Sequence, residues 1–533
     1  MRIPIDVALG RPSERLESRL LPSVDVLTYH NDNSRLGANL AETTLTAANV
    51  NASTFGKLRQ VAVDGQVYAQ PLVKTGVAIP GVGVRNVVYV ATEHDSVYAF
   101  DADTLALLWH DGFINPAAGV STESSQDVDT IDIYPEIGIT GTPVIDPANG
   151  HLYVVSVVKT VSKTGAVGFT QQLHALDLAT GAESLGGPVS LQANVRGSGK
   201  GSLRGTLSYQ ARWQNQRSAL LLSNGVVYIA SASFSDHGPY HGWVLGYDAK
   251  TLKQASVFVA TPNGSKAGIW MSGGGPAADG YGNIYLSTGN GTFHPVGLKG
   301  DFGDSVLKLA PGKGKLNVVD YYAPSNQAKL AAKDLDLASG GVALLPDQPG
   351  AHPHLLVTGG KDGTLYLLNR DRLGGYSKRD KVVQKLTGAL PAVFDTPAYF
   401  NGRLYYVGTV DQAETKLKGD VLKAFMLDGG RIAPKPLTAS HLEAFPGASP
   451  SVSANGSNNG IVWTLTSDKA RGAATLRAYN ANHIDEELYN SLQAGSRDLP
   501  GAFVKFSVPT VANGKVYVGG AGTLALYGLL PKG

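Results

Sequence analysis

Short apolar runs separated by turns dominate the pattern of hydrophobic and polar positions along the chain. Most runs are about four to six residues long and rich in β-branched or aromatic residues, and Gly, Asn or Asp stands between them. Runs of this length and composition favour strands over helices. Gly150 opens one example, Gly-His-Leu-Tyr-Val-Val-Ser, and Leu173 opens its partner, Leu-His-Ala-Leu-Asp-Leu-Ala-Thr-Gly. The pattern therefore predicts pairs of strands that close on small acidic turns.

This two-strand unit recurs about eight times. The predicted first strands lie at residues 87–90, 152–155, 226–230, 284–287, 355–358, 404–407, 461–465 and 516–519. Their predicted partners end at residues 98–101, 173–177, 244–248, 306–309, 365–368, 421–427, 476–479 and 524–527. A repeat with a period of tens of residues is typical of solenoids and propellers. All-β units of this kind predict an all-β fold, an eight-bladed β-propeller.

The two ends of the repeated region predict how the ring closes. The last unit reaches Leu530, so the chain leaves no room after it for an outermost strand. A strand-like run that starts at Phe55 precedes the first unit and has no partner of its own. We expect this run to complete the last blade, because such closure leaves no free sheet edge around the ring. Residues 1–54 are then a lead-in segment and residues 55–533 a single propeller domain.

Composition narrows the function classes. Lys and Arg number 45 against 43 Asp and Glu, so no basic field is available to hold nucleic acid or an anionic membrane. No apolar run approaches the roughly 18 residues of a membrane span. The chain has no cysteine, which excludes disulfides, thiolate metal sites, a Cys nucleophile and a CxxCH haem site. We expect a small-molecule substrate or ligand as the partner, and a protein partner stays open.

The N-terminus carries only a short apolar stretch, which Pro4 and Asp6 interrupt. It is therefore not the hydrophobic region of a signal peptide. Two interpretations stay open: the protein is cytoplasmic, or it is exported with a signal that this sequence lacks.

The repeats resemble those of pyrroloquinoline quinone (PQQ) dehydrogenases and their quinoprotein-like relatives. The segment Asp-Ala-Asp-Thr-Leu-Ala-Leu-Leu-Trp, from Asp101 to Trp109, is similar to the docking motif of that family, although only this copy keeps the Trp. The resemblance covers roughly residues 55–530 and implies the eight-bladed fold. Because relatives of this type are mostly exported, it also implies a periplasmic or extracellular location.

A sharper resemblance runs through three segments in the family's order. Ser-Thr-Gly-Asn290-Gly-Thr is similar to the segment whose Asn binds the metal. Lys-Asp334-Leu-Asp336 is similar to the segment whose first Asp is the catalytic base and whose second occurs in lanthanide-type members. Gly-Lys361-Asp-Gly resembles the segment whose Arg or Lys contacts the quinone. The resemblance implies a Ca²⁺ or lanthanide ion on the first three residues, Asp334 as base, and PQQ against Lys361.

The sequence also departs from the family at positions that hold the metal and the quinone. The hairpin aligned with the family's metal-binding Glu offers Asp236 or His237 as metal ligands, but no Glu. The Trp that floors the quinone in the family falls near Gly273, and the nearest Trp is Trp270, a candidate cofactor contact. The vicinal disulfide over the quinone is impossible without cysteine. These losses remove stacking surfaces for a flat cofactor and weaken the metal site.

The residue types alone, apart from the resemblance, also suggest a metal site. Asn290, Asp334 and Asp336, with Asp236 or His237, form an oxygen-rich set that suits a hard cation such as Ca²⁺. A structural alternative is that Asn290 caps a turn and the two Asp residues make Asx-turns where the chain enters a blade.

A dense polar and aromatic cluster forms a second candidate site. Tyr240, His241 and Trp243 follow Asp236 on a short loop with Gly and Pro. Such a loop suits ligand recognition, with Tyr240 and Trp243 as cofactor contacts, or acid–base catalysis by His241. A structural loop with a hydrogen-bonded histidine explains the pattern equally well.

Loops that lead into the innermost strands of the blades form a third candidate site, because in propellers of this type they face the mouth of the channel. The loop before the second blade carries Glu136, a general acid or base if its pKa is raised by burial. The equivalent loops carry Tyr68 and Gln70, Arg212 and Gln214, Trp270, Asp336, and Asp395. This ring suits a polyol, a sugar or a peptide, with Arg212 as a further cofactor contact; a water-filled polar channel is the alternative.

Two functions therefore remain from sequence. The first is a quinoprotein-like oxidoreductase that acts on an alcohol, polyol or sugar at the channel mouth. The second is a PQQ-independent propeller that binds a ligand or a protein, or that performs cofactor-free acid–base catalysis of the lyase, isomerase or cyclase type.

Overall fold

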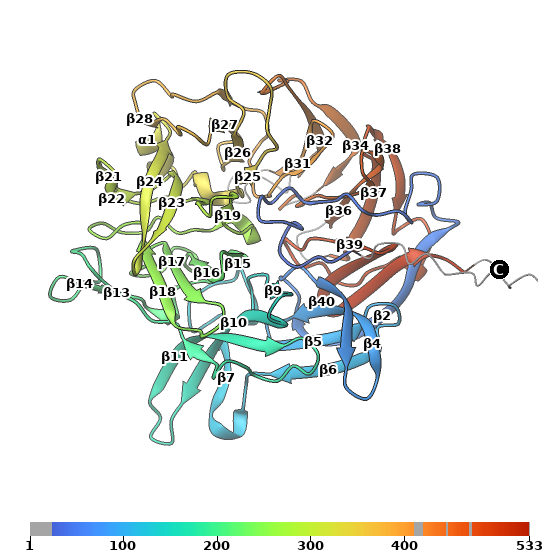
Figure 1. Cartoon of the computed structure of the whole chain (residues 1–533), viewed down its shortest axis with the longest axis horizontal. Helices are drawn as coiled ribbons and strands as arrows, with labels where there is room; N and C mark the ends of the chain where they lie inside the picture. Colours follow the sequence, from blue (N-terminus) through green and yellow to red (C-terminus); the bar gives the residue numbers. More distant parts are fainter. Residues whose placement is uncertain (1–23, 410–418, 444–445, 468–471, 532–533) are drawn as a thin grey trace, which may run out of the picture.

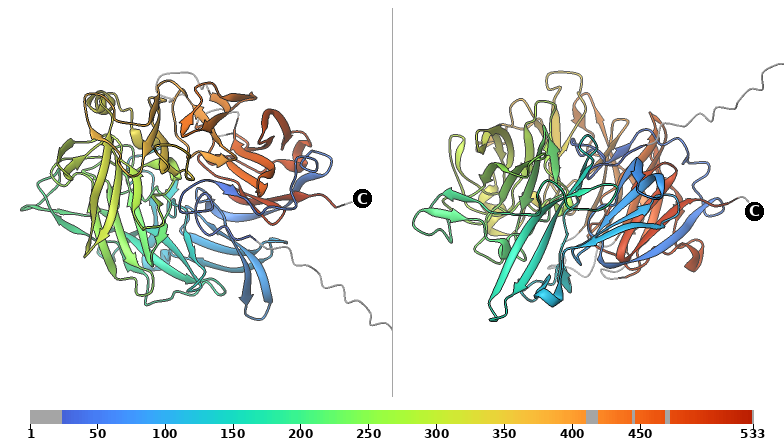
Figure 2. Two further views of the ribbon diagram at one scale, coloured as in Figure 1. Left: turned by 45° about the horizontal axis from the view of Figure 1, so that its top comes forward. Right: turned by 60° about the horizontal axis from the view of Figure 1, so that its bottom comes forward.

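The computed structural model describes residues 24–409, 419–443, 446–467 and 472–531. Sheets are arranged as eight blades in a ring (Figure 1), and two further views show the same ring from other directions (Figure 2). Within a blade the main strands pair antiparallel, and they follow one another in sequence except in the last blade, whose outer strand comes from near the start of the chain. The first strands of successive blades contact one another around the centre of the ring, as β9, β15, β19 and β25 do. The predicted eight-bladed fold is confirmed.

The blades have the following strands, from the centre outwards. Blades one and two are β3 (Leu72–Ile79), β4 (Gly83–Ala91), β5 (Ser96–Asp101), β6 (Leu107–Gly112), and β9 (Val144–Asp146), β10 (His151–Val161), β11 (Val167–Asp177), β12 (Val189–Ser190). Blades three and four are β15 (Leu221–Ser223), β16 (Val226–Ser231), β17 (Trp243–Asp248), β18 (Gln254–Val259), and β19 (Ala277–Ala278), β20 (Ile284–Ser287), β23 (Val306–Gly312), β24 (Lys315–Ala323).

Blades five and six are β25 (Ala343–Leu344), β26 (Leu355–Gly359), β27 (Leu365–Asn369), β29 (Gln384–Leu386), and β30 (Ala398–Phe400), β31 (Arg403–Thr409), β32 (Gly419–Asp428), β34 (Leu437–Glu443). Blade seven is β35 (Ser451–Asn455), β36 (Asn458–Thr466), β37 (Thr475–Asn480) and β38 (His483–Asn490). Blade eight is β39 (Thr510–Ala512), β40 (Lys515–Leu529) and β2 (Phe55–Gln66). All sixteen predicted strand segments lie within strands of these blades, the last two together in β40.

The N-terminal strand closes the ring as predicted. Strand β2 pairs antiparallel with β40, from Phe55 opposite Leu529 to Ala62 opposite Thr523. The ring of Phe55 is fully buried and packs edge-on against Tyr489, with centroids 5.0 Å apart. Closure therefore joins the two ends of the chain by backbone hydrogen bonds and by a shared aromatic core.

A tyrosine of the repeat explains part of how neighbouring blades hold together. It lies on the second strand of a blade and donates its hydroxyl to a backbone carbonyl at the acidic turn of the next blade. A buried hydroxyl needs such an acceptor, and each bond contributes about 1 kcal/mol. The pairs are Tyr89 with Leu178 (2.8 Å), Tyr153 with Ala249, Tyr405 with Ala481 (2.7 Å) and Tyr517 with Ala102 (2.8 Å).

The tryptophan of the docking-like segment also reaches the next blade. The indole N–H of Trp109 in β6 donates to the carbonyl of Leu178, at 3.1 Å. A Cβ on Gly181 would lie 2.6 Å from that indole ring, so only glycine allows this approach.

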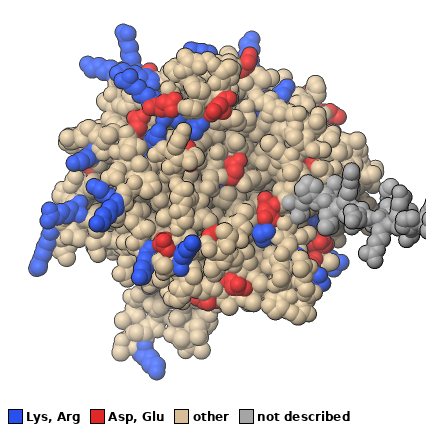
Figure 3. Space-filling model, viewed as in Figure 1, with Lys and Arg blue, Asp and Glu red and all other residues tan. Residues whose placement is uncertain are grey.

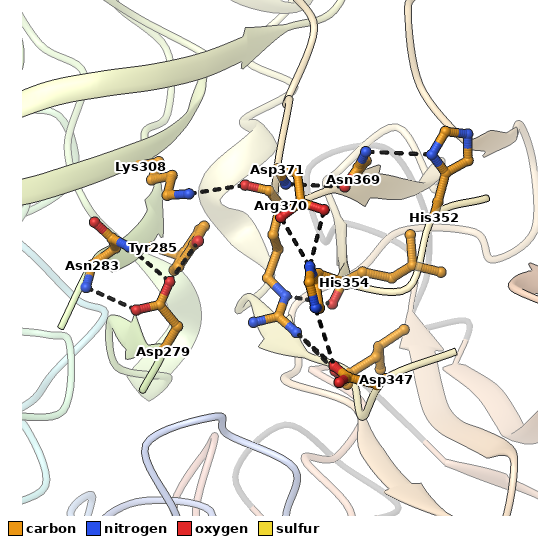
Figure 4. A network of polar contacts seen from close by, with 12 residues as sticks. Asp279, Asn283, Tyr285, Lys308, Asp347, His352, His354, Asn369, Arg370 and Asp371 are labelled. Atoms are coloured by element: carbon orange, nitrogen blue, oxygen red, sulfur yellow. Dashed lines mark hydrogen bonds and ion pairs between the residues drawn. The ribbon is translucent and has the colours of Figure 1, made fainter. Parts of the chain in front are cut away.

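A polar network outside the centre of the ring joins blades four and five (Figure 4). Lys308 of β23 donates to the carbonyl of Arg370, at 3.0 Å, just after β27. Nδ1 of His354 lies 2.9 Å from the carboxylate of Asp371, and the guanidinium of Arg370 lies 3.9 Å from Asp347. The side chains of Asp347 and Asp371 are more than half exposed and that of Arg370 is 13% exposed, so the network lies at the surface of the ring.

Segments between the blade strands carry the remaining elements. They include β7 (Val120–Ser124) with β8 (Glu136–Ile137), and the hairpins β13 (Asn194–Arg196) with β14 (Thr206–Ser208) and β21 (Phe293–Val296) with β22 (Lys299–Phe302). The others are α1 (Gln327–Ala332), β28 (Gly375–Tyr376) and β33 (Arg431–Ile432). Within the described part of the chain, no helix is long and apolar enough to cross a membrane.

Residues 24–54 of the predicted lead-in lie against the propeller, and residues 1–23 lie outside the described part. Strand β1 (Ala38–Asn39) adds to β35 in parallel. Arg35 is fully buried and donates to the carbonyls of Tyr29, Leu220 and Pro276. This arginine thus fixes the lead-in to the inner strands of blades three and four. The domain boundary at residue 54 stays a prediction.

Candidate functional site

A cavity of about 430 Å³ lies among the loops that lead into the innermost strands. Six blades supply one such residue each: Tyr68, Arg217, Trp270, Asp336, Phe394 and Phe506. The remaining lining residues are Asp132, Ile133, Asn215, Ser233, Phe234, Ser235, Asp236, Ser272, Asp334, Ser339, Lys361 and Lys505. The volume falls within the range of about 300–1,000 Å³ that is typical of small-molecule sites. On the face seen in Figure 3, basic and acidic side chains are interspersed, so the outer surface there carries no field of one sign.

One wall of the cavity brings together three residues predicted from different segments. The ammonium of Lys361 lies 2.8 Å from Oδ2 of Asp336 and 3.0 Å from Oδ2 of Asp334. The side chain of Asp336 is 10% exposed, and that of Asp334 is 64% exposed. The arrangement is a buried ion pair with a second carboxylate that faces the cavity.

Asn290 lies behind this wall and fixes both carboxylates. Its backbone N–H donates to Oδ1 of Asp336 at 2.7 Å, and its side-chain Nδ2 donates to Oδ1 of Asp334 at 2.6 Å. Gly289 makes this possible, because a Cβ there would lie 2.3 Å from Oδ1 of Asp336. The side-chain Oδ1 of Asn290 is buried and has no hydrogen-bond partner among the described residues.

Burial and charge shift the pKa values of this wall in opposite ways. Burial raises the pKa of Asp336, and the ammonium of Lys361 opposes that rise. Burial alone would lower the pKa of Lys361, but Asp336 and Asp334 outweigh it and hold the pKa above its usual value. Lys361 therefore stays charged. Behind them, burial and the charge of Asp336 raise the pKa of Asp304 to about 8.

Asp236 also lines the cavity, but other side chains occupy its oxygens. Lys266 lies 2.8 Å from Oδ2, and the hydroxyl of Tyr240 donates to Oδ1. The ring of Tyr240 is buried and meets Trp270 edge-on, with centroids 6.4 Å apart. Burial, together with Asp236, raises the pKa of Tyr240, so its hydroxyl remains a donor. Tyr240 thus acts as support for two cavity residues.

Three other residues of the predicted loop do not line this cavity. His237 lies 3.6 Å from Asp129 near the surface. His241 is buried, with Nδ1 2.9 Å from Oγ1 of Thr261 and Nε2 2.9 Å from the carbonyl of Lys200. Burial lowers the pKa of His241. Trp243 packs in the core of blade three, and it lines a separate cavity of about 190 Å³ together with His241.

Glu136 and Arg212 also lie away from the cavity wall. Oε2 of Glu136 lies 2.9 Å from Nδ1 of His94 and accepts a hydrogen bond from Thr122 at 3.0 Å. Arg212 donates to the carbonyl of Asp127 at 3.0 Å and lies over the ring of Trp213. Of the predicted site residues, the central cavity thus gathers Asp236, Trp270, Asp334, Asp336 and Lys361, with Asn290 and Tyr240 directly behind them.

Left-handed backbone conformations gather at this cavity. Non-glycine residues at positive φ are unfavourable and concentrate where function demands a particular geometry. Five lining residues adopt them: Ser235 (46°), Asp236 (61°), Ser272 (46°), Asp334 (56°) and Phe506 (67°). For Phe506, a bulky side chain, this conformation is the most costly. The strain at these five positions supports a functional role for the cavity, while the other residues at positive φ lie elsewhere in the described chain.

Sequence reasoning missed two prominent lining residues, Arg217 and Phe506. The loop before blade three suggested Arg212 and Gln214, yet Arg217, four residues before β15, is the side chain that faces the cavity. Asp336, seven residues before β25, shows that this distance differs between blades. The signal in the sequence was an arginine one serine before the apolar run Ala-Leu-Leu-Leu, where a charge is otherwise unexpected.

The chain matches no protein-family model and no curated protein sequence. Solved structures with the same fold include quinohemoprotein alcohol dehydrogenase ADHIIG from Pseudomonas putida HK5, with a TM-score of 0.59 and 16% identity over 95% of this chain and 81% of that one. The quinohemoprotein alcohol dehydrogenase of Comamonas testosteroni gives 0.56 and 14% over 96% and 82%. A europium-containing methanol dehydrogenase gives 0.57 and 13% over 95% and 98%. The chain has the propeller fold of the quinoprotein dehydrogenases at low sequence identity.

Proposed function

We propose that this protein is a quinoprotein-like oxidoreductase that oxidises an alcohol, polyol or sugar in the central cavity. The observation that carries the proposal is the wall formed by Asp334, Lys361 and Asp336, with Asn290 behind it, in a cavity of small-molecule size. Two dehydrogenase neighbours act on alcohols by name and share the fold. We also propose that the protein acts outside the cytoplasm.

Each residue of the wall has a distinct task. Asp334 presents a largely exposed carboxylate to the cavity, so it can accept the proton of a substrate hydroxyl. Lys361 holds that carboxylate by an ion pair and balances its charge. Asp336 is buried and anchors the ammonium from the other side. The base is thus positioned before the substrate arrives, which is what efficient proton transfer requires.

Part of this wall offers the donor atoms that a cation uses and the surfaces that a quinone uses. The orphaned Oδ1 of Asn290, next to the carboxylates of Asp334 and Asp336, gives oxygen ligands of the kind that Ca²⁺ or a lanthanide prefers. Trp270 and Lys361 would contact PQQ, and Tyr68, Phe234, Phe394 and Phe506 add aromatic surface to the cavity. PQQ supplies the acceptor for the two electrons that oxidation of a hydroxyl group releases.

One observation favours the second function, cofactor-free binding or acid–base catalysis. Every carboxylate oxygen of Asp334 and Asp336 already has a hydrogen-bonding partner, and the ammonium of Lys361 supplies the positive charge between them. In addition, the described residues contain no group of three or more His, Cys, Asp or Glu side chains placed to hold a metal. Under this function Asp334 is still the proton acceptor.

A titration separates the two functions. Purified protein is titrated with PQQ in the presence of Ca²⁺ or La³⁺, while quinone absorbance and dye-linked oxidation of alcohols are followed. We expect saturable binding and turnover, and we expect Asp334→Asn to abolish turnover while the protein stays folded. Asp371→Asn is the matched control, because Asp371 lies in the surface network of Figure 4 and should leave turnover unchanged. Absence of saturable PQQ binding with either cation would refute the oxidoreductase and leave the cofactor-free function.

A further inference from the structure

A guanidinium faces the central cavity without a direct ion pair among the described residues. The residue Arg217 is 7% exposed and lines the cavity. Its Nη2 is buried without a hydrogen-bond partner, and no carboxylate of the described chain forms an ion pair with Arg217. By contrast Arg35, equally buried, donates to several carbonyls. A buried guanidinium with an unbonded N–H group and no direct ion pair is unfavourable, so it points to a partner that comes from outside the chain.

The surroundings of Arg217 hold the guanidinium in place but do not neutralise it. Its guanidinium carbon lies 5.6 Å from the ring centre of Tyr68 and 5.0 Å from that of Phe506. Two aromatic faces stabilise a cation and restrict its orientation. Gly273 borders the same group at a φ of 92°, and a Cβ there would lie 3.0 Å from Nη1. Phe506 adopts a left-handed conformation where it makes this contact.

The neighbouring acids Glu93 and Asp132 favour the charge of Arg217 from a distance but form no direct ion pair with it. Asp132, which also lines the cavity, lies 3.0 Å from the ammonium of Lys505. Glu93 lies deeper; its Oε2 accepts from the N–H of Gly138 at 2.8 Å, and burial raises its pKa to about 7. The cavity end at Arg217 therefore keeps a net positive character. A planar carboxylate is the group that a guanidinium recognises best, because two N–H groups can bond its two oxygens together.

We propose that Arg217 is the carboxylate-binding residue of this cavity, and that the substrate is a hydroxy acid or an acidic sugar rather than a neutral polyol. The carboxylate docks between the rings of Tyr68 and Phe506, and the hydroxyl-bearing part extends into the rest of the cavity, whose wall holds Asp334. This inference deepens the proposed function and rests on it for the use of the hydroxyl group. The binding of the carboxylate itself requires no turnover.

Binding of matched probes tests the proposal. Glycolate, gluconate and galacturonate are compared with ethylene glycol, sorbitol and galactose by isothermal titration calorimetry of the full chain, with and without PQQ and Ca²⁺. We expect at least one acid to bind tenfold or more tightly than its neutral counterpart. Arg217→Met should abolish that preference, Arg217→Lys should keep part of it, and Arg431→Gln, an exposed arginine of β33 outside the cavity, should keep all of it.

Thermal unfolding of the same variants distinguishes a binding residue from a structural one. Since Arg217 is buried without a direct ion pair, Arg217→Met should leave the Tm unchanged or raise it. Equal affinity for acids and neutral probes would overturn the proposal, as would a preference that survives in Arg217→Met. If Arg217→Met does not fold, an undiminished preference for acids in Arg217→Lys would refute the proposal. Loss of PQQ binding alone would assign Arg217 to the cofactor and overturn it as well. Acid binding without any oxidation would refute only the proposed function.

Discussion

Replacing Lys361 by methionine tests the electrostatics of the cavity wall directly. The substitution keeps an unbranched side chain of similar length and removes the ammonium that lies 2.8 Å from Asp336 and 3.0 Å from Asp334. Asp334 is mostly exposed, so water replaces that partner at a cost of at most about 1 kcal/mol. Asp336 is buried, and its carboxylate would be left with only the backbone N–H of Asn290 at Oδ1. The effect should therefore come almost entirely from Asp336.

The magnitude follows from the burial of that pair. Removing one partner of a buried ion pair costs about 3–5 kcal/mol, and the slight exposure of both side chains favours the lower figure, about 3 kcal/mol. Unfolding releases about 2.1 cal/mol/K per residue near 60 °C, or about 1.1 kcal/mol/K for 533 residues. A loss of about 3 kcal/mol then lowers the Tm by about 3 °C.

The loss should depend on pH in a defined direction. Burial already raises the pKa of Asp336 above 3.8, and removal of Lys361 takes away the main opposing effect, so the pKa rises further in the variant. When the pKa of a carboxyl is higher in the folded than in the unfolded protein, the carboxyl does not reduce the free energy of unfolding at a pH below its unfolded pKa. The free energy of unfolding then falls as the pH rises towards the folded pKa. The Tm difference between wild type and variant should therefore be small near pH 4–5 and largest near pH 8.

Differential scanning calorimetry at both pH values measures this difference. The double variant Lys361→Met with Asp336→Asn should recover most of the loss, because no buried carboxylate then remains unpaired. Lys515→Met is the matched control, since its partner Asp103 is more than half exposed, and it should change the Tm by less than about 1 °C. A Tm difference that is the same at both pH values, or a double variant no more stable than the single one, would refute the reasoning.

Two further predictions concern the scaffold. Glu123 is fully buried, neither of its oxygens has a hydrogen-bond partner in the described chain, and burial raises its pKa from 4.5 to about 8. Glu123→Gln should therefore become more stable than wild type as the pH rises from about 4.5 to about 8, and the difference should stay constant above that. Urea unfolding curves that shift equally at all pH values would contradict this prediction. Phe55→Ala removes the buried ring at the closure of β2 on β40, so it should cost about 3–5 kcal/mol and expose the N-terminal strand to limited proteolysis; an unchanged proteolytic pattern would show that closure does not depend on this ring.

The candidate site was only partly predictable, for a geometric reason. Asn290, Asp334 and Lys361 lie up to 71 residues apart, yet their motifs predicted that they belong together, and they do meet in one hydrogen-bonded wall. The sequence also suggested His241 as an acid–base residue, but its side chain is buried between Thr261 and a backbone carbonyl. Arg217 was passed over in the sequence, although its Nη2 is buried at the cavity without a hydrogen-bond partner among the described residues. Which way a loop side chain points depends on neighbouring blades, and no local pattern records that.

Local features of the sequence specify each blade of the scaffold: apolar runs of strand length, turns of Gly, Asn and Asp, and a tyrosine repeated at the position that bonds the next blade. Even ring closure followed from counting strands at the two ends of the chain. Tertiary structure alone decided which polar side chains share a cavity, which are buried among their own partners, and which keep an unbalanced charge. Those properties arise from loops of six blades that converge on one axis, and they depend on distances between residues that are far apart in the chain.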